Sequence, residues 1–157
     1  MRIIGIDPGT LVCGYGVIDV AGSSMKAVTW GAVRVRSDTP FAQRLLGVHR
    51  GLTKVIAEWK PETAAVERLF VGKNVRSAMA TGEGRGIAVL TAALAELPVF
   101  EYTPAEVKKA VVGQGAAHKT QVQEMVRILL ALEKVPTPHD ASDALAIAIT
   151  HAQRARF

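Results

Sequence analysis

The sequence predicts an α/β fold with a mixed sheet that is covered by helices on both faces. Short apolar segments bounded by turn residues occupy the first third of the chain, a helical apolar period follows, and strands then alternate with helices. The chain has 157 residues, with no internal repeat, low-complexity tract or linker. This length fits one domain of ordinary size, so we expect a single domain over residues 1–157.

Three strands are predicted at the start of the chain. Short apolar or β-branched runs, separated by Gly, Ser and Asp, cover residues 1–6, 14–20 and 26–36. In the third run Val33 and Val35 alternate with two arginines, which predicts one buried face and one basic, solvated face.

A helix and a strand are expected next. Apolar residues recur at helical spacing from residue 39, and this helix should end near Lys60 because Pro61 follows. The apolar run at residues 63–66 then predicts a short buried strand. Glu67 is expected at the C-terminal end of that strand.

A second helix is predicted over residues 75–90, although Gly82, Gly84 and Gly86 lie within it. Each glycine inside a helix costs on the order of 1 kcal/mol relative to alanine. We therefore expect another backbone to approach this helix closely at its glycines.

The last third of the chain predicts one strand and three helices. Residues 98–102 read as the strand, and Thr103 to Glu106 have the form of a capping box with proline at the first helical position. Two amphipathic helices are predicted over residues 120–132 and 140–153, separated by two prolines.

Composition restricts the function classes. The net charge of +5, from 19 basic and 14 acidic residues, favours a polyanionic partner. Cys13 is the single cysteine, which excludes an intrachain disulfide and a cysteine metal cluster. We find no signal peptide and no apolar run long enough to cross a bilayer, so we expect a soluble cytoplasmic protein without membrane contact.

Four carboxylates lie where an apolar context makes ionisation costly. Asp7 and Glu67 end two apolar runs, whereas Asp140 and Asp143 open the last helix and share a face of its first turn. Taken singly, each has a structural explanation, as a turn former, a solvated strand exit, or a helix cap with a first-turn partner. Together they would repel one another unless divalent cations neutralise them.

Such an acidic cluster predicts a metal-dependent nuclease. Oxygen ligands without cysteine select Mg²⁺, with Mn²⁺ as a substitute, and two ions about 3.5–4 Å apart support phosphodiester hydrolysis without a protein nucleophile. His139 stands beside Asp140 and is an accessory candidate, able to offer a ring nitrogen to metal or substrate, with an ordinary surface histidine as the alternative.

Basic residues follow Glu67 along the chain and are candidates for DNA contacts. An ordinary solvated face is the alternative for each of them. Phe70 lies among Arg, Lys and Asn in a predicted loop and could stack on an unpaired base. The basic candidates for phosphate contact are Lys73, Arg76, Lys108 and Lys119.

These residues resemble the RuvC Holliday-junction resolvases, which are bacterial endodeoxyribonucleases of the RNase H-like superfamily. The resemblance runs through IGIDPGT, VERLFVGKN, the GRG segment, LPVFEYTPAEVKKAVVGQG and DASDALAIAITHA. It implies an RNase H-like five-stranded mixed sheet flanked by helices, a homodimer, and Mg²⁺-dependent symmetrical nicking of four-way DNA junctions in recombination and repair. It also implies the RuvAB branch-migration complex as a partner.

The resemblance also assigns roles to individual residues. The catalytic, metal-binding carboxylates fall on Asp7, Glu67, Asp140 and Asp143. Phe70 matches the base-stacking aromatic of the family, and Lys108 and Lys119 match basic residues near the scissile phosphate. Some members carry histidine at the position of Asp140, and here His139 precedes it.

Two other classes can be compared with this interpretation. Actin-like and sugar-kinase ATPases also begin with a strand and an Asp-x-Gly-Thr loop, which Asp7 to Thr10 fit, but that fold needs a second lobe that 157 residues do not provide. A non-catalytic junction-binding protein would keep the basic loops and lose the carboxylates. All four acidic positions are occupied, which favours a nuclease.

Overall fold

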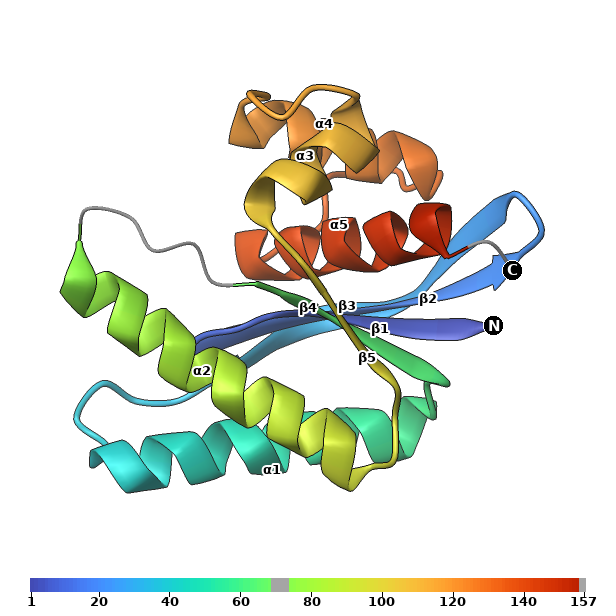
Figure 1. Cartoon of the computed structure of the whole chain (residues 1–157). Coiled ribbons are helices and arrows are strands. Elements are labelled where there is room, and N and C mark those ends of the chain that lie inside the picture. The colour runs from blue at the N-terminus through green and yellow to red at the C-terminus, as the bar shows by residue number, and fades with distance from the viewer. Residues whose placement is uncertain (69–73, 156–157) are drawn as a thin grey trace.

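The computed structural model describes residues 1–68 and 74–155 (Figure 1). These residues form a five-stranded sheet in the order β3-β2-β1-β4-β5. Strand β1 pairs antiparallel with β2 and parallel with β4, so the sheet is mixed, as predicted. The elements are β1 (Arg2–Asp7), β2 (Val12–Ala21), β3 (Ser24–Arg34), α1 (Phe41–Trp59), β4 (Thr63–Glu67), α2 (Val75–Leu94), β5 (Val99–Tyr102), α3 (Pro104–Val112), α4 (Lys119–Leu129) and α5 (His139–Arg154).

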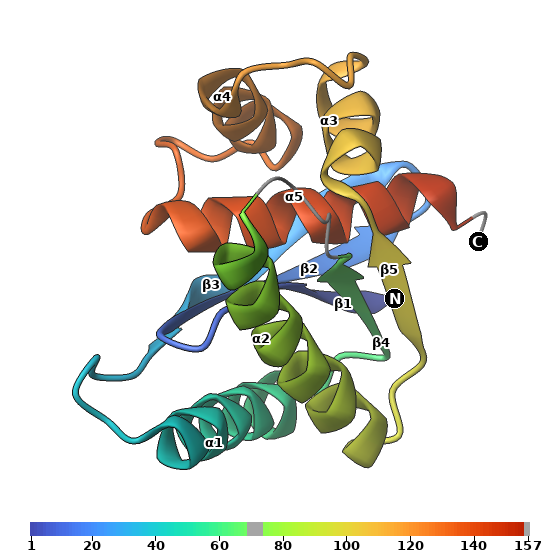
Figure 2. The same ribbon diagram turned by 60° about the vertical axis from the view of Figure 1, so that its left-hand side comes forward.

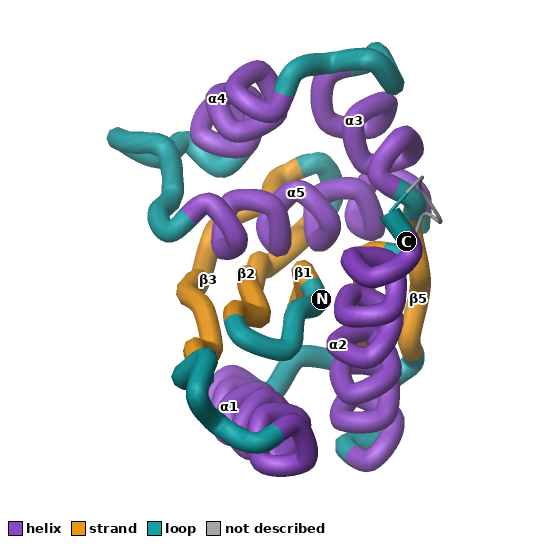
Figure 3. The backbone as a smooth tube through the Cα atoms, turned by 90° about the vertical axis from the view of Figure 1, so that its left-hand side faces the viewer, coloured by secondary structure: helices purple, strands orange, loops and turns teal. Residues whose placement is uncertain are grey.

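Helices cover both faces of the sheet, which confirms the predicted layering. Helices α1 and α2 lie on one face and α5 on the other, with α3 and α4 on the outer side of α5 (Figures 1 and 3). Successive residues of β1 point to opposite faces. Ile3 therefore joins the core beneath α5, whereas Ile4 and Ile6 join the core with α1. Within the described residues, no helix has both the length and the apolar character needed to cross a membrane.

Element ends differ from the prediction by a few residues, for local reasons. Strand β3 stops at Arg34, which pairs with Val12, the first residue of β2. One further backbone hydrogen bond, from Val35 N–H to the carbonyl oxygen of Leu11, follows the last pair. Arg36 instead pairs with Asp38. The capping box predicted at the start of α3 is present, with Thr103 and Glu106 bonded reciprocally.

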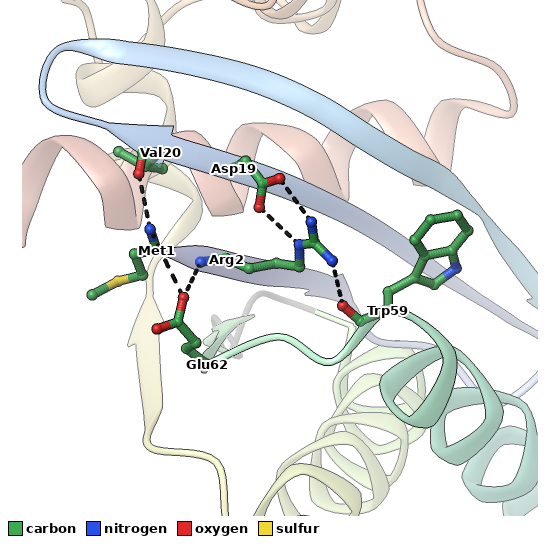
Figure 4. Close-up of polar contacts among 6 residues, drawn as sticks. All are labelled: Met1, Arg2, Asp19, Val20, Trp59 and Glu62. Carbon is green, nitrogen blue, oxygen red and sulfur yellow. Dashed lines mark hydrogen bonds and ion pairs between the residues drawn. The ribbon is translucent and has the colours of Figure 1, made fainter.

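A polar network holds the start of β1 (Figure 4). The Arg2 guanidinium donates two hydrogen bonds of 2.8 Å to the Asp19 carboxylate and one of 2.8 Å to the carbonyl oxygen of Trp59. The backbone N–H of Arg2 donates to Glu62 Oε2 at 2.6 Å. These contacts tie β1 to β2, to the end of α1 and to the residues before β4. Because Asp7 lies at the other end of β1, the network helps to fix the strand that carries it.

The glycines of α2 have different surroundings. An added Cβ at Gly84 would lie 2.9 Å from three backbone atoms of Gly9, so the close approach expected from the sequence is confirmed there. At Gly86 a Cβ would meet nothing within 4 Å, and the expectation is wrong for that residue.

We therefore expect opposite effects from two alanine substitutions in α2. Gly86→Ala should raise the free energy of unfolding by about 0.5–1 kcal/mol, because only helix propensity changes. Gly84→Ala should lower it by about 1–3 kcal/mol, because backbone must move. Urea denaturation of both variants is the measurement, and equal effects would contradict the assignment of the contact.

Candidate active site

The four predicted acidic residues lie on two strand ends and one helix. Asp7 is the last residue of β1, and Glu67 is the last residue of β4. These strands are adjacent and parallel, so both carboxylates leave the sheet at the same edge. Asp140 and Asp143 lie in the first turns of α5, which crosses the sheet above that edge. Pro138 occupies the N-cap position of α5, so Asp140 is not the cap.

Glycines in the strands bring α5 onto the sheet. Gly14 of β2 pairs with Asp7, and a Cβ added to it would overlap the carbonyl oxygen of Asp140. A Cβ on Gly5 would overlap the carbonyl oxygen of Ala144 in the same way. Only glycine permits this approach, which carries the N-terminal turn of α5 toward Asp7. Isolated glycines inside strands are a sequence signal for such contacts, and the sequence analysis missed it here.

The carboxylates interact electrostatically. Burial, with the charges of Glu67, Asp143 and Asp140, raises the pKa of Asp7 to about 8. Burial, followed by the charge of Asp143, also raises the pKa of Glu67. The acidic side chains are therefore close enough for their charges to oppose the ionisation of Asp7 and Glu67.

Two lysines face the same cluster. Lys119 Nζ lies 2.9 Å from Asp143 Oδ2, and this hydrogen bond raises the pKa of Lys119. Lys108 and Lys119 line a cavity of about 200 Å³ together with Glu67 and Asp143. The remaining walls of this cavity are Pro104, Val107, Val122 and Ala146. Two of the predicted phosphate-binding residues thus adjoin two of the predicted carboxylates.

The acidic cluster does not have a preformed metal geometry. Among residues 1–68 and 74–155, no three His, Cys, Asp or Glu side chains are grouped so that they could already hold a metal ion. Two features fit this observation: Asp143 is paired with Lys119, and bringing the negative charges of the cluster together without a cation is unfavourable, as the raised pKa of Asp7 shows. The donor set consists of carboxylate oxygens and fits a hard divalent cation such as Mg²⁺ or Mn²⁺ better than Zn²⁺.

The other predicted residues have different placements. Arg76 is exposed near the start of α2. Phe70 and Lys73 lie outside the described residues. The ring of His139, the first residue of α5, lies with Nδ1 3.0 Å from Gln123 Nε2 of α4. Gln123 could not be recognised from the sequence, because a lone glutamine within an amphipathic helix carries no chemical signature.

The mixed sheet, with acidic residues at the ends of β1 and β4 and on α5, defines an α/β protein of the RNase H-like class. The sequence profile of the family described as crossover junction endodeoxyribonuclease RuvC matches residues 3–151. The chain belongs to this family.

The alignments with similar proteins include almost the whole chain. The crossover junction endodeoxyribonuclease RuvC of Heliobacterium modesticaldum is 52% identical over 149 residues, which are 95% of this chain and 92% of the relative. That of Syntrophotalea carbinolica is 53% identical over 152 residues, covering 97% and 94%. The solved structure of T. thermophilus RuvC in complex with Holliday junction substrate has a TM-score of 0.92 and 36% identity over 99% of this chain and 95% of that one.

Proposed function

We propose that the protein resolves four-way DNA junctions by paired symmetrical nicks, using divalent metal ions held by Asp7, Glu67, Asp140 and Asp143. The observation that supports this most directly is the convergence of these carboxylates beside Lys108 and Lys119, reflected in the pKa of about 8 for Asp7. The match to a RuvC structure in complex with Holliday junction substrate supports the substrate class.

The side chains have distinct tasks in this proposal. Bound Mg²⁺, with two ions per site, would supply Lewis-acid activation of water and stabilisation of the leaving oxygen. The carboxylates would hold the metal ions in position at the edge of the sheet. Lys119 would exchange its contact with Asp143 for a contact with the phosphate at the cut, and Lys108, which lines the same cavity, would supply a second positive charge. The excess of positive charge on the chain supports phosphate binding beyond this cavity.

A cleavage assay on two substrates tests the function. A labelled four-way junction and a linear duplex with the same arm sequence are incubated with Mg²⁺ or with EDTA. We expect symmetrical nicks in the junction with Mg²⁺ only, and no cutting of the duplex. Binding of the junction without cutting, over a range of Mg²⁺ and Mn²⁺ concentrations, would favour the alternative of a non-catalytic junction-binding protein.

A homodimer through α2 is part of the proposal. Large apolar side chains of this helix are exposed: Val75, Met79, Leu90 and Leu94, with exposed fractions between 51% and 67%. A two-fold dimer would present two active sites to the two equivalent strands of a junction. RuvAB as a partner, base stacking by Phe70, a cytoplasmic location and a single nuclease domain over residues 1–157 are further parts of the proposal.

Met79→Glu tests the dimer. Burying a new charge at a helix interface is costly, so we expect the variant to be a monomer at micromolar concentration while the wild type is a dimer. Light scattering measures the mass of both proteins. The matched control is Lys54→Glu on the exposed surface of α1, which should remain a dimer. A monomeric wild type that cuts junctions fully would contradict the proposal.

A further inference from the structure

The end of β3 carries an exposed arginine at the edge of the sheet where the carboxylates gather. Arg34 is the last residue of β3 and pairs with Val12, the first residue of β2. Strand β2 is antiparallel to both of its neighbours, so its start lies between the end of β3 and the end of β1. Arg34 therefore lies at the same edge of the sheet as Asp7.

The side chain of Arg34 is on the face of the sheet that α5 covers. The preceding residue, Val33, packs into the core with α1 on the opposite face. Two residues before Arg34, Ala32 pairs with Gly14, the glycine that lies directly beneath the backbone of Asp140. Side chains alternate along a strand, and paired residues share a face. Arg34 is thus one residue pair beyond the place where α5 begins.

Positive groups flank the acidic cluster on both sides. The sheet order is β3-β2-β1-β4-β5, and the carboxylates lie over its middle strands, from β2 to β4. The cavity with the two lysines adjoins Glu67 at the end of β4 and Pro104 just after β5. Arg34 lies on the other side, on β3. Figures 2 and 3 show the start of α5 on this side, above β2 and β3.

The charge of Arg34 is available for a ligand. Its side chain is exposed, and within the described part of the chain, residues 1–68 and 74–155, it takes part in no ion pair or side-chain hydrogen bond. Arg36 is also exposed, but Asp38 neutralises it at a distance of 2.6 Å. A guanidinium presents its N–H donors in a planar fork that fits the oxygens of a phosphate. The end of β3 therefore offers an unpaired anion-binding group beside the acidic cluster.

We infer that Arg34 binds a phosphate of the DNA strand that passes over the carboxylates, on the side of the cut away from Lys108 and Lys119. The inference rests on the proposed nuclease function and adds a substrate contact to it. A strand whose scissile phosphate lies at the carboxylates continues past them in both directions. Its flanking phosphates are repelled by the acidic cluster, so a cation is needed on each side. Arg34 supplies the cation at β3 and fixes how far the strand advances along the edge of the sheet.

Salt-dependent binding of a four-way junction in EDTA tests the contact without cleavage. Arg34→Gln should weaken binding by about 10-fold and lower the slope of log K against log salt by about 1, because each neutralised phosphate contributes about 0.9 to it. Arg34→Lys should restore the slope, since lysine also neutralises a phosphate. Lys26→Gln, the matched control at the exposed far end of β3, should leave affinity and slope unchanged. Arg34→Gln should also melt at the wild-type temperature, because the side chain is exposed. An unchanged slope with Arg34→Gln would overturn the inference.

A scan of neutral phosphates locates the contact. Junctions carry one methylphosphonate per cleaved strand, at successive positions on either side of the cut, and kcat/KM for cleavage is measured with Mg²⁺. We expect one position on one side to cost the wild type about 10-fold and to cost Arg34→Gln nothing further, whereas the other positions affect both proteins equally. Additive losses at every position would show that Arg34 contacts no phosphate of the cleaved strand and would refute the inference. If the wild type cuts no junction, the proposed function fails, while the same scan of binding in EDTA still decides the contact of Arg34.

Discussion

Asp7→Asn is expected to reduce junction cleavage by at least about 1,000-fold while junction binding changes little, because neutralising one carboxylate removes a ligand and transition-state charge stabilisation. Junction binding depends on lysines and arginines that this substitution leaves in place. Single-turnover cleavage with Mg²⁺ and an electrophoretic binding assay with EDTA measure the two quantities. Glu67→Gln and Asp143→Asn should behave in the same way.

The same Asp7→Asn variant should be more stable than the wild type in the absence of metal. The pKa of Asp7 is about 8 in the folded protein, whereas the ordinary value is 3.8. Between these values the folded state binds one proton more than the unfolded state, so this group makes stability fall as pH rises from about 4 to 8. The carboxamide of the variant cannot ionise, so the variant lacks this loss of stability.

Thermal denaturation in EDTA across this pH range gives the comparison. At about pH 8.5 we expect Asp7→Asn to gain about 2–4 kcal/mol, less than the roughly 6 kcal/mol of the full pKa displacement because water and nearby charges relax. The gain should shrink toward pH 5, and Mg²⁺ should reduce it at pH 8.5. Two results would contradict the proposed role of Asp7. One is that Asp7→Asn and the wild type have equal melting temperatures both at pH 5 and at pH 8.5. The other is that the variant loses as much junction binding as cleavage.

Gly14→Ala is expected to affect stability and activity together. The new Cβ would overlap the carbonyl oxygen of Asp140, and backbone rather than a flexible side chain must move. We expect a loss of about 3 kcal/mol or more in the free energy of unfolding, and reduced cleavage even well below the melting temperature, because α5 carries Asp140 and Asp143.

Gly115→Ala is the matched control for this prediction. Its added Cβ would meet the Ala105 carbonyl oxygen at 3.7 Å, an ordinary contact, so stability should change by less than about 1 kcal/mol. Urea denaturation and Mg²⁺-dependent cleavage of both variants are the measurements. Wild-type cleavage by Gly14→Ala would show that the close approach of α5 is not needed to position its carboxylates.

Local sequence patterns were sufficient to predict the helices and strands and the positions of the acidic residues along them. The capping box at Thr103 and the apolar runs that end at Asp7 and Glu67 depend on residues close in sequence, and the structure has all three features where they were predicted. Strand parallelism then places the two strand-end carboxylates at one edge of the sheet. The glycines of α2 show the limit of such reasoning, since identical residues two positions apart have different surroundings.

The mixed α/β fold, the family resemblance and the chemical types in the candidate site all followed from the order of residues along the chain. Four contacts became known from the folded molecule: Gly5 and Gly14 each allow the backbone of α5 to lie directly on the sheet, Lys119 pairs with Asp143, and Gln123 Nε2 lies 3.0 Å from His139 Nδ1. The physical reason is that these contacts join elements distant in sequence. They depend on strand register and on how closely α4 and α5 approach, and neither quantity is encoded in a local periodicity or a spacing between residues.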